Sequence, residues 1–251
     1  TTAFAAENPA EVFDRVMEKN NTIQSAEIQS GVHSVILAKD VIPDGQMKVD
    51  MAMHAEMDMQ DTTDLKYLAQ VASSILGQDS YSQVFYTDGY YYVDANGVKL
   101  KYPMPLEQII SSVQTGVNTS NMESSYMKGI SLNEVNGKRV LAYEANPKKL
   151  NKNVKEALGT VMNTLGTDVN LDMNIQEMKG AYVLDDNDYI IYMTNYIVYN
   201  MEVLDQPMTC ITLMETEVQN PGEPVVVTLP STDGYEDLIG LYDGVIESEV
   251  E

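Results

Sequence analysis

The sequence contains few of the side chains on which catalytic and metal sites depend. In 251 residues there are one cysteine, two histidines and no tryptophan. His33 and His54 are predicted to lie on the polar faces of separate strands, without the spacing of a zinc site or a catalytic triad. No glycine-rich phosphate loop and no G-x-S-x-G motif occurs. We therefore expect no enzymatic activity, no metal and no cofactor, and we expect Cys210 to be a buried apolar residue.

Positive charge is also scarce. Lysine and arginine together number 15 against 38 aspartates and glutamates, which gives a formal net charge of −23. The main group of basic residues, Lys148, Lys149, Lys152 and Lys155, falls within a predicted helix, where we interpret it as a solvated face. An acidic chain repels phosphate backbones and anionic lipids, so we expect no nucleic-acid partner and no electrostatic docking to a membrane.

Long hydrophobic runs are missing, since no segment approaches the ~18–20 apolar residues of a membrane span. Hydrophobic residues nevertheless make up 44% of the chain, which is enough for a folded core. The chain begins at Thr1 with small and polar residues, and we interpret 1–7 as a tether from which a targeting segment was removed. We expect a single domain over 8–243, followed by an acidic tail at 244–251.

Helix signals recur where asparagine and proline precede apolar residues at helical spacing. Asn8 and Pro9 supply an N-cap and a first turn, and Asn146 and Pro147 repeat this chemistry. Helical spacing also precedes Gly77, which is typical of a C-terminal cap. We predict helices at 8–21, 64–76, 105–113, 146–165 and 232–241.

Elsewhere the pattern has a period of two, which indicates strands with one polar face. The clearest case runs from Met47 to Gln60, where methionines alternate with charged side chains. Asp88-Gly89, Asn96-Gly97 and Asn136-Gly137 are typical of two-residue hairpin turns. The acidic run 185–188 also falls at a turn, and calcium ligation is its alternative interpretation. We predict strands at 23–42, 47–60, 81–87, 90–94, 98–102, 127–135, 139–145, 168–184, 189–204, 208–219 and 225–229.

This order of elements favours an α+β fold, a curved antiparallel sheet with helices packed on one side. The chain has 16 methionines, whose flexible thioethers adapt to variable apolar ligands. We therefore predict a cavity lined by Met51, Met53, Met57, Leu171 and Met173, with ordinary core packing as the alternative.

Tyrosine is equally frequent. A second candidate site consists of tyrosines that would bind a protein partner; the alternative is that they are simply amphipathic strand residues. These tyrosines are Tyr86, Tyr90, Tyr91, Tyr92, Tyr192, Tyr196 and Tyr199.

Two segments carry a resemblance to a known group of proteins. They are the meander "YTDGYYYVDANGVKLKYP", with Asp88-Gly89-Tyr90-Tyr91 at its first turn, and Val227-Thr228-Leu229-Pro230 near the end. In these and in the order of its elements the chain resembles bacterial lipoproteins of the LolA/LppX-like superfamily, particularly uncharacterised members from Gram-positive gut bacteria. The resemblance implies a strongly curved antiparallel β half-barrel, covered on its concave side by helices, with an apolar cavity between them.

The same resemblance implies a location outside the cytoplasm and a role in carriage. Better-known relatives carry lipids or lipoproteins, and a lipidated cysteine upstream of Thr1 would anchor the protein to the cell membrane. We therefore expect an extracytoplasmic lipoprotein that binds a lipid or another apolar small molecule without catalysis. The alternative is a cell-envelope interaction module that binds a protein and has no ligand cavity.

Overall fold

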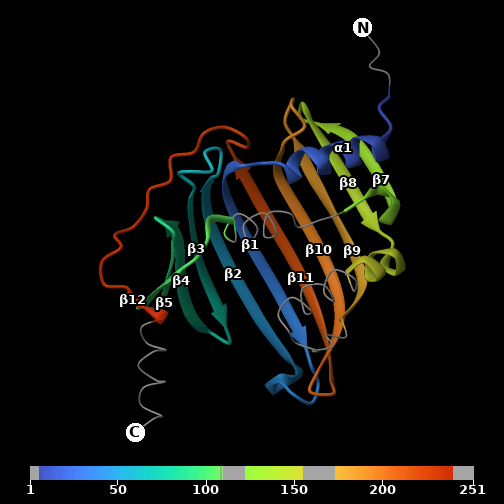
Figure 1. Cartoon of the computed structure of the whole chain (residues 1–251). Coiled ribbons are helices and arrows are strands. Elements are labelled where there is room, and N and C mark those ends of the chain that lie inside the picture. The colour runs from blue at the N-terminus through green and yellow to red at the C-terminus, as the bar shows by residue number, and fades with distance from the viewer. Residues whose placement is uncertain (1–5, 108, 110–121, 155–172, 240–251) are drawn as a thin grey trace. The chain divides into compact units, whose positions relative to one another are not determined.

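The computed structural model describes residues 6–107, 109, 122–154 and 173–239. Their strands form one open sheet in the order β12-β6-β5-β4-β3-β2-β1-β11-β10-β9-β8-β7 (Figure 1). The pairings within each half are antiparallel, apart from the short parallel pair of β12 and β6. The strands are β1 (Ser25–Leu37), β2 (Gln46–Asp58), β3 (Lys66–Ile75), β4 (Gln78–Thr87), β5 (Tyr90–Ala95), β6 (Val98–Pro103), β7 (Met127–Val135), β8 (Lys138–Ala145), β9 (Met173–Leu184), β10 (Ile190–Val203), β11 (Gln206–Gln219) and β12 (Glu236–Asp237).

The chain groups into two compact units. Unit 1 consists of Thr1–Asn20, Gly31–Asp50 and Ser120–Glu217, and unit 2 of Asn21–Ser30, Met51–Thr119 and Val218–Glu251. Strands β1 and β2 each contribute residues to both units. One domain over 8–243 remains a prediction. Among the described residues, no helix is long and apolar enough to cross a membrane.

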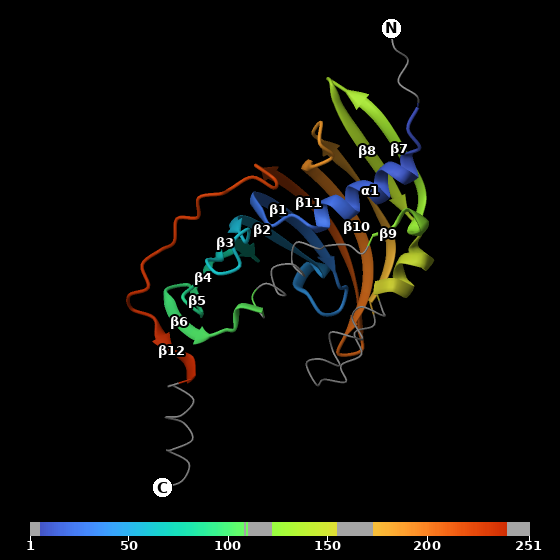
Figure 2. The same ribbon diagram turned by 45° about the horizontal axis from the view of Figure 1, so that its top comes forward.

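Unit 1 is built around the helix α1 (Pro9–Asn21), which lies across β8, β9 and β10 (Figures 1 and 2). The predicted cap is confirmed, because the Asn8 Oδ1 accepts hydrogen bonds from the backbone amides of Ala10 (2.9 Å) and Glu11 (3.3 Å). One face of α1 packs against the sheet and closes a buried cluster, whose members include Val12, Phe13, Val16, Met17, Leu141, Tyr143, Ile175, Tyr182, Leu184 and Ile190. Burial of this apolar face stabilises the helix on the sheet.

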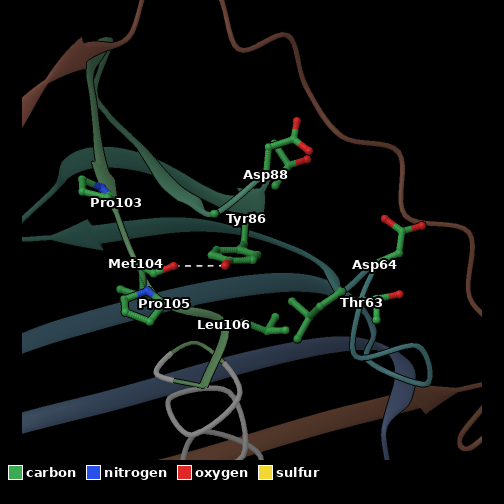
Figure 3. A pocket seen from close by; sticks show the side chains of 11 residues that line it. Thr63, Asp64, Tyr86, Asp88, Pro103, Met104, Pro105 and Leu106 are labelled. Atoms are coloured by element: carbon green, nitrogen blue, oxygen red, sulfur yellow. Dashed lines mark hydrogen bonds between the residues drawn. The ribbon is translucent and has the colours of Figure 1, made fainter.

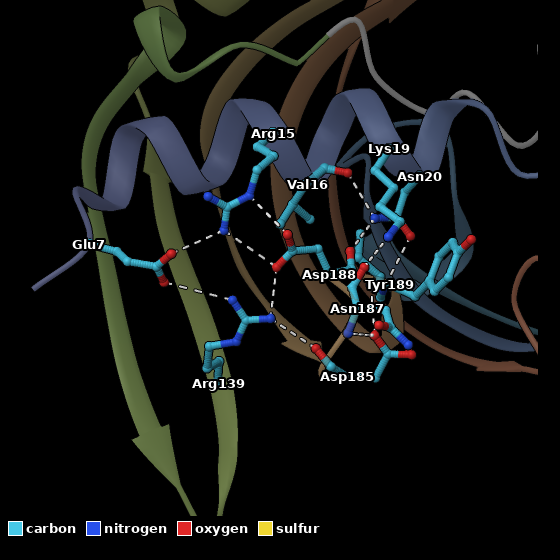
Figure 4. Close-up of polar contacts among 11 residues, drawn as sticks. Glu7, Arg15, Val16, Lys19, Asn20, Arg139, Asp185, Asn187, Asp188 and Tyr189 are labelled. Atoms are coloured by element: carbon cyan, nitrogen blue, oxygen red, sulfur yellow. Dashed lines mark hydrogen bonds and ion pairs between the residues drawn. The ribbon is translucent and has the colours of Figure 1, made fainter. Parts of the chain in front are cut away.

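Two arginines tie the acidic turn between β9 and β10 to its neighbours, Arg15 to α1 and Arg139 to β8 (Figure 4). The Asp188 carboxylate accepts from Arg15 Nε at 2.9 Å and from Arg139 Nη2 at 2.7 Å. The Asp185 Oδ1 accepts from the backbone amides of Asn187 and Tyr189, as in an Asx turn. These contacts favour the plain-turn interpretation of 185–188 over calcium ligation.

Replacing Asp188 with asparagine is expected to destabilise the protein by about 1–2 kcal/mol at pH 7, because two charge-assisted hydrogen bonds are lost. Partial burial opposes ionisation of this carboxyl, but the hydrogen bonds from Arg15 and Arg139 hold its pKa below its ordinary value. A depressed folded-state pKa gives stability that is present above the unfolded-state pKa and is lost as the pH falls through the folded one.

Urea unfolding of the wild type and of Asp188→Asn at pH 7 and at pH 3 measures this effect. The difference between them should shrink at pH 3, where the wild-type carboxylate begins to take up its proton. Asp186→Asn, at an exposed position in the same turn, is the control and should leave stability within about 0.5 kcal/mol. A pH-independent difference would contradict the ionic role of Asp188.

Three predicted hairpin turns are confirmed in their backbone conformation. Asp88-Gly89, Asn96-Gly97 and Asn136-Gly137 all have positive φ at both residues, as the twist of a two-residue hairpin requires. The predicted strands 189–204 and 208–219 leave a turn at 205–207, but the turn begins one residue earlier, at Leu204-Asp205 (φ 52° and 61°), and Gln206 already begins β11. Cys210 is buried, as predicted.

The helix predicted at 64–76 is wrong, because Lys66–Ile75 is the strand β3. Leu76 and Gly77 both have positive φ (52° and 73°) and form a tight turn rather than a helix cap. The turn sends the chain directly into β4, which pairs with β3 along its whole length. Cross-strand pairing therefore outweighs the helical spacing of the apolar residues.

The strand predicted at 225–229 and most of the helix at 232–241 are also wrong. Residues 220–235, which we call the strap, contain neither strand nor helix, and β12 (Glu236–Asp237) follows them. The prolines at 221, 224 and 230 cannot donate to a ladder. The backbone amides of Val225 and Thr228 instead donate to the carboxylates of Asp58 (3.2 Å) and Glu56 (3.4 Å). Only 238–239 are helical among the described residues of that helix.

Two other predicted helices begin where expected. Residues 106, 107 and 109 are helical, and so are 147–154, where the Asn146 Oδ1 accepts from the amides of Lys148 (3.1 Å) and Lys149 (3.4 Å). The rest of both helices, and the predicted strand residues 168–172, lie outside the described residues.

In unit 2 the strap covers one face of the sheet. A buried cluster on this face contains Leu68 of β3, Phe85 of β4, Tyr92 of β5 and Val227 of the strap. Tyr235 completes it, with its ring perpendicular to those of Phe85 (5.7 Å between centroids) and Tyr92 (5.1 Å). We call this side the strap face. Residues one position away along each strand point to the opposite face.

Candidate functional site

The face of unit 2 opposite the strap carries four tyrosines in line, one from each strand from β3 to β6. Tyr67 pairs with Tyr86, Tyr86 with Tyr91, and Tyr91 with Tyr102. Directly opposed residues of antiparallel strands project from the same face and lie next to each other. The rings of Tyr91 and Tyr102 are 5.3 Å apart between centroids. We call these four residues the tyrosine row.

The phenols of the tyrosine row are held in their neutral form. Burial raises the pKa of Tyr67, Tyr86 and Tyr102, and it raises the pKa of Tyr91 to about 12, with a smaller contribution from the neighbouring phenols. A neutral phenol both donates and accepts a hydrogen bond. The row therefore offers apolar ring surface together with polar groups, which suits an amphiphilic molecule.

A pocket of about 470 Å³ lies beside Tyr86 (Figure 3). Of its apolar and aromatic members, Leu65, Tyr86 and Met104 are buried. Its polar members include Asp64 and Asp88, whose carboxylates lie on the same side of the Tyr86 ring in Figure 3. The remaining lining residues are Thr63, Thr87, Gly89, Pro103, Pro105 and Leu106. This volume falls in the range of small-molecule pockets, ~300–1,000 Å³.

Two hydrogen bonds hold the wall of this pocket in place. The Tyr86 hydroxyl donates to the Met104 carbonyl at 3.0 Å, and the Met104 amide donates to the Gly89 carbonyl at 2.9 Å. The segment after β6 is thereby fixed to the turn between β4 and β5. Asp88 sits in that turn with a φ of 51°. The arrangement can hold an apolar group against Leu65 and attract a positive or hydrogen-bond-donating group at the acidic side.

The five residues predicted to line a cavity are distributed as follows. On β2, burial increases along the methionine face, from Met51 (39% exposed) through the half-buried Met53 to Met57 (1% exposed). Met173 is half-buried at the start of β9, opposite Met201, and Leu171 lies outside the described residues. None of the four described residues among them belongs to the lining of the 470 Å³ pocket. Their role as a cavity lining stays a prediction.

The tyrosines proposed as a partner-binding surface do not share one face. Tyr86 and Tyr92 are buried on opposite faces of unit 2, and Tyr90 packs against the strap-face cluster. The use of the others by a protein partner stays a prediction. Sequence reasoning did not single out Tyr67, Tyr102 or the pocket residues Leu65 and Met104.

Comparisons with known proteins place the chain in a family without assigning it a function. The model of a "Family of unknown function (DUF6612)" matches residues 8–230. No curated protein matches. Among solved structures, the chain is similar to the ywiB protein from Bacillus subtilis, with 11% identity, a TM-score of 0.24, and coverage of 79% of this chain and 96% of that one. It is also similar to a beta-barrel-like protein of DUF1849 from Brucella abortus, with 10% identity, a TM-score of 0.24, and coverage of 77% and 98%.

Proposed function

The chain belongs to the family of unknown function DUF6612, so we infer its function from its own side chains. We propose that unit 2 binds a small amphiphilic molecule. The observation that supports this is the 470 Å³ pocket beside Tyr86, which combines buried apolar walls with two carboxylates. The pocket offers polar and apolar surface together, and a binding site for a small molecule likewise combines apolar contact with polar groups that orient the ligand.

The charge of the pocket selects among amphiphiles. Asp64 and Asp88 are exposed carboxylates at the pocket, and the whole chain carries a net charge of −23. An anionic head group would be repelled, whereas a cationic or hydrogen-bond-donating head group would be attracted. The apolar tail would contact Leu65 and Met104 and could continue along the tyrosine row, which shares Tyr86 with the pocket.

The resemblance noted in the sequence extends this proposal to location and ligand. We propose that the protein acts outside the cytoplasm as a membrane-anchored lipoprotein with a LolA-like half-barrel, that its ligand is lipid-like, and that it catalyses no reaction. The open antiparallel sheet is compatible with such a fold.

Calorimetric titration of the full chain with monomeric dodecyltrimethylammonium, compared with dodecyl sulfate, tests the proposal. We expect one binding site for the cationic amphiphile and weaker binding of the anionic one. Leu106→Trp, which fills the pocket, should abolish binding while thermal unfolding shows that the variant is folded. No saturable binding by the wild type, or unchanged binding by Leu106→Trp, would refute the proposed pocket.

Removing one carboxylate tests the charge preference. Asp88→Asn is expected to weaken binding of dodecyltrimethylammonium by about two- to fivefold, the effect of one exposed ion pair. Asparagine tolerates positive φ as well as aspartate does, so the turn should persist. Asp44→Asn is a matched control, because Asp44 also has positive φ (61°) before a glycine but belongs to unit 1. An equal loss in both variants would show that only net charge matters.

A further inference from the structure

Three metal-binding side chains meet on the strap face of unit 2, away from the pocket. The His54 Nε2 lies 2.9 Å from the Glu27 Oε1 and 3.9 Å from the Glu56 Oε1. One donor atom from each residue lies within 4.8 Å of the other two. All three residues are half-buried. Glu27 comes from β1, and His54 and Glu56 are two residues apart on β2, so both project from one face of the strand.

In this cluster a single imidazole faces two carboxylates. Two carboxylates held this close repel each other, in a chain whose net charge is already −23. The His54 Nε2 makes its 2.9 Å contact with Glu27, and Glu56 is a full ångström farther away. A divalent cation between the three donors would attract both carboxylates and would accept the imidazole nitrogen as a ligand.

A backbone amide of the strap, which is not itself part of the cluster, orients the Glu56 carboxylate. The backbone amide of Thr228 donates to the Glu56 Oε2 at 3.4 Å, while the other oxygen of that carboxylate, Oε1, is the one nearest His54. A neighbouring strap amide, that of Val225, donates to Asp58 at 3.2 Å. In metal sites, such outer hydrogen bonds hold the ligands in their binding orientation.

We propose that Glu27, His54 and Glu56 bind a divalent transition-metal ion of the zinc class, with solvent in the remaining positions. Mixed imidazole and carboxylate ligands suit Zn²⁺, whereas Ca²⁺ and Mg²⁺ prefer oxygen alone. Donors around a tetrahedral Zn²⁺ ion with bonds of ~2.0–2.1 Å are ~3.4 Å apart. The present separations of 2.9 Å and 3.9 Å lie on either side of that value, so small side-chain rotations would complete the site.

The chain contains its own control for this proposal. His33 and Asp50 also form a histidine–carboxylate pair, at 2.8 Å, and both side chains are 57% exposed. This pair supplies two donors, and neither residue belongs to a cluster of three metal-binding side chains among the described residues. His33→Gln therefore removes the same chemical group as His54→Gln without touching the proposed site.

Calorimetric titration of the full chain with ZnCl₂ at physiological salt tests the site. We expect one saturable site, weakened at least about tenfold in His54→Gln and in Glu27→Gln and unchanged in His33→Gln. Excess CaCl₂ should not compete. Equal loss in the two histidine variants, no loss in either, or full competition by Ca²⁺ would overturn the proposal in favour of diffuse binding to an acidic surface.

A second measurement on the wild type does not depend on how the variants fold. The chain has only two histidines, so its proton NMR spectrum contains two sets of imidazole signals, which His33→Gln assigns. One equivalent of Zn²⁺ should shift or broaden the His54 set and leave the His33 set in place. Movement of both sets together, or of the His33 set alone, would overturn the site, and so would the absence of any change.

Discussion

Replacing Gly180 with alanine is expected to destabilise the protein by about 3 kcal/mol, as severe overpacking does. Gly180 lies in β9 between Tyr143 of β8 and Asn195 of β10. A Cβ atom there would clash with the backbone carbonyl oxygen of Thr194, and it would lie 2.8 Å from the Asn195 Oδ1 and 2.9 Å from the Tyr143 Cε1. A backbone atom in a three-stranded pairing cannot move away cheaply.

A hydrogen bond between the two neighbours of Gly180, Tyr143 and Asn195, adds to this cost. The Tyr143 hydroxyl donates to the Asn195 Oδ1 at 2.5 Å, and both residues are buried, so moving either one would break a buried hydrogen bond. Urea unfolding followed by far-ultraviolet circular dichroism measures the loss. Gly129→Ala in β7 is the matched control, because among the described residues no atom beyond its two chain neighbours lies within 4 Å of the Cβ position there. Equal stability of the two variants would refute the steric argument.

Much of the fold follows from short-range signals that act within a few residues. Asn8 caps its helix through its own side chain, and Asp88-Gly89 and Asn96-Gly97 adopt the backbone that a two-residue hairpin requires. Such turns also set the register of the strands that they join. The opposition of Tyr86 to Tyr91 and of Tyr91 to Tyr102 could therefore have been predicted from the sequence.

The errors lie where contacts between different segments, rather than the pattern within one segment, decide the structure. The apolar spacing of 64–76 suits a helix, and only pairing with β4 shows that it is a strand; Leu76 at positive φ is an uncommon turn residue. Tyr67, the first member of the tyrosine row, was missed with it. Within the strap, residues 225–229 have the composition of a strand, yet the amides of Val225 and Thr228 donate to side chains of β2.

The Glu27–His54–Glu56 cluster could not be predicted from the sequence for a related reason. A long connection, which includes the short helical turn η1 (Pro43–Gly45), joins β1 to β2, so no tight turn sets the register of this pair. Residues 27 and 54 are far apart in the sequence, and alternation predicts only that each projects from a polar face. Both histidines had been predicted to lie on polar strand faces. His33 is exposed, whereas His54 is half-buried beside two carboxylates.

Replacing Phe13 with alanine is expected to have the largest effect of all, a loss of about 3–5 kcal/mol in the free energy of unfolding. Phe13 is fully buried and makes edge-to-face contacts with Tyr143 (6.0 Å between centroids) and Tyr182 (6.3 Å). Truncation removes the transfer free energy of the ring and the edge-to-face contacts, and it leaves a cavity that the paired strands cannot fill.

The position of Phe13 makes this loss informative about α1. The helix packs against β8, β9 and β10 through a single apolar face, and Phe13 stands at the centre of that face between Val12 and Val16. We expect the variant to unfold at lower urea and to lose far-ultraviolet signal from α1 first. Val135→Ala, at an apolar position of unit 1 that is 52% exposed, should change stability by less than about 0.5 kcal/mol. If Phe13→Ala cost as little as Val135→Ala, α1 would not be an integral part of the core of unit 1.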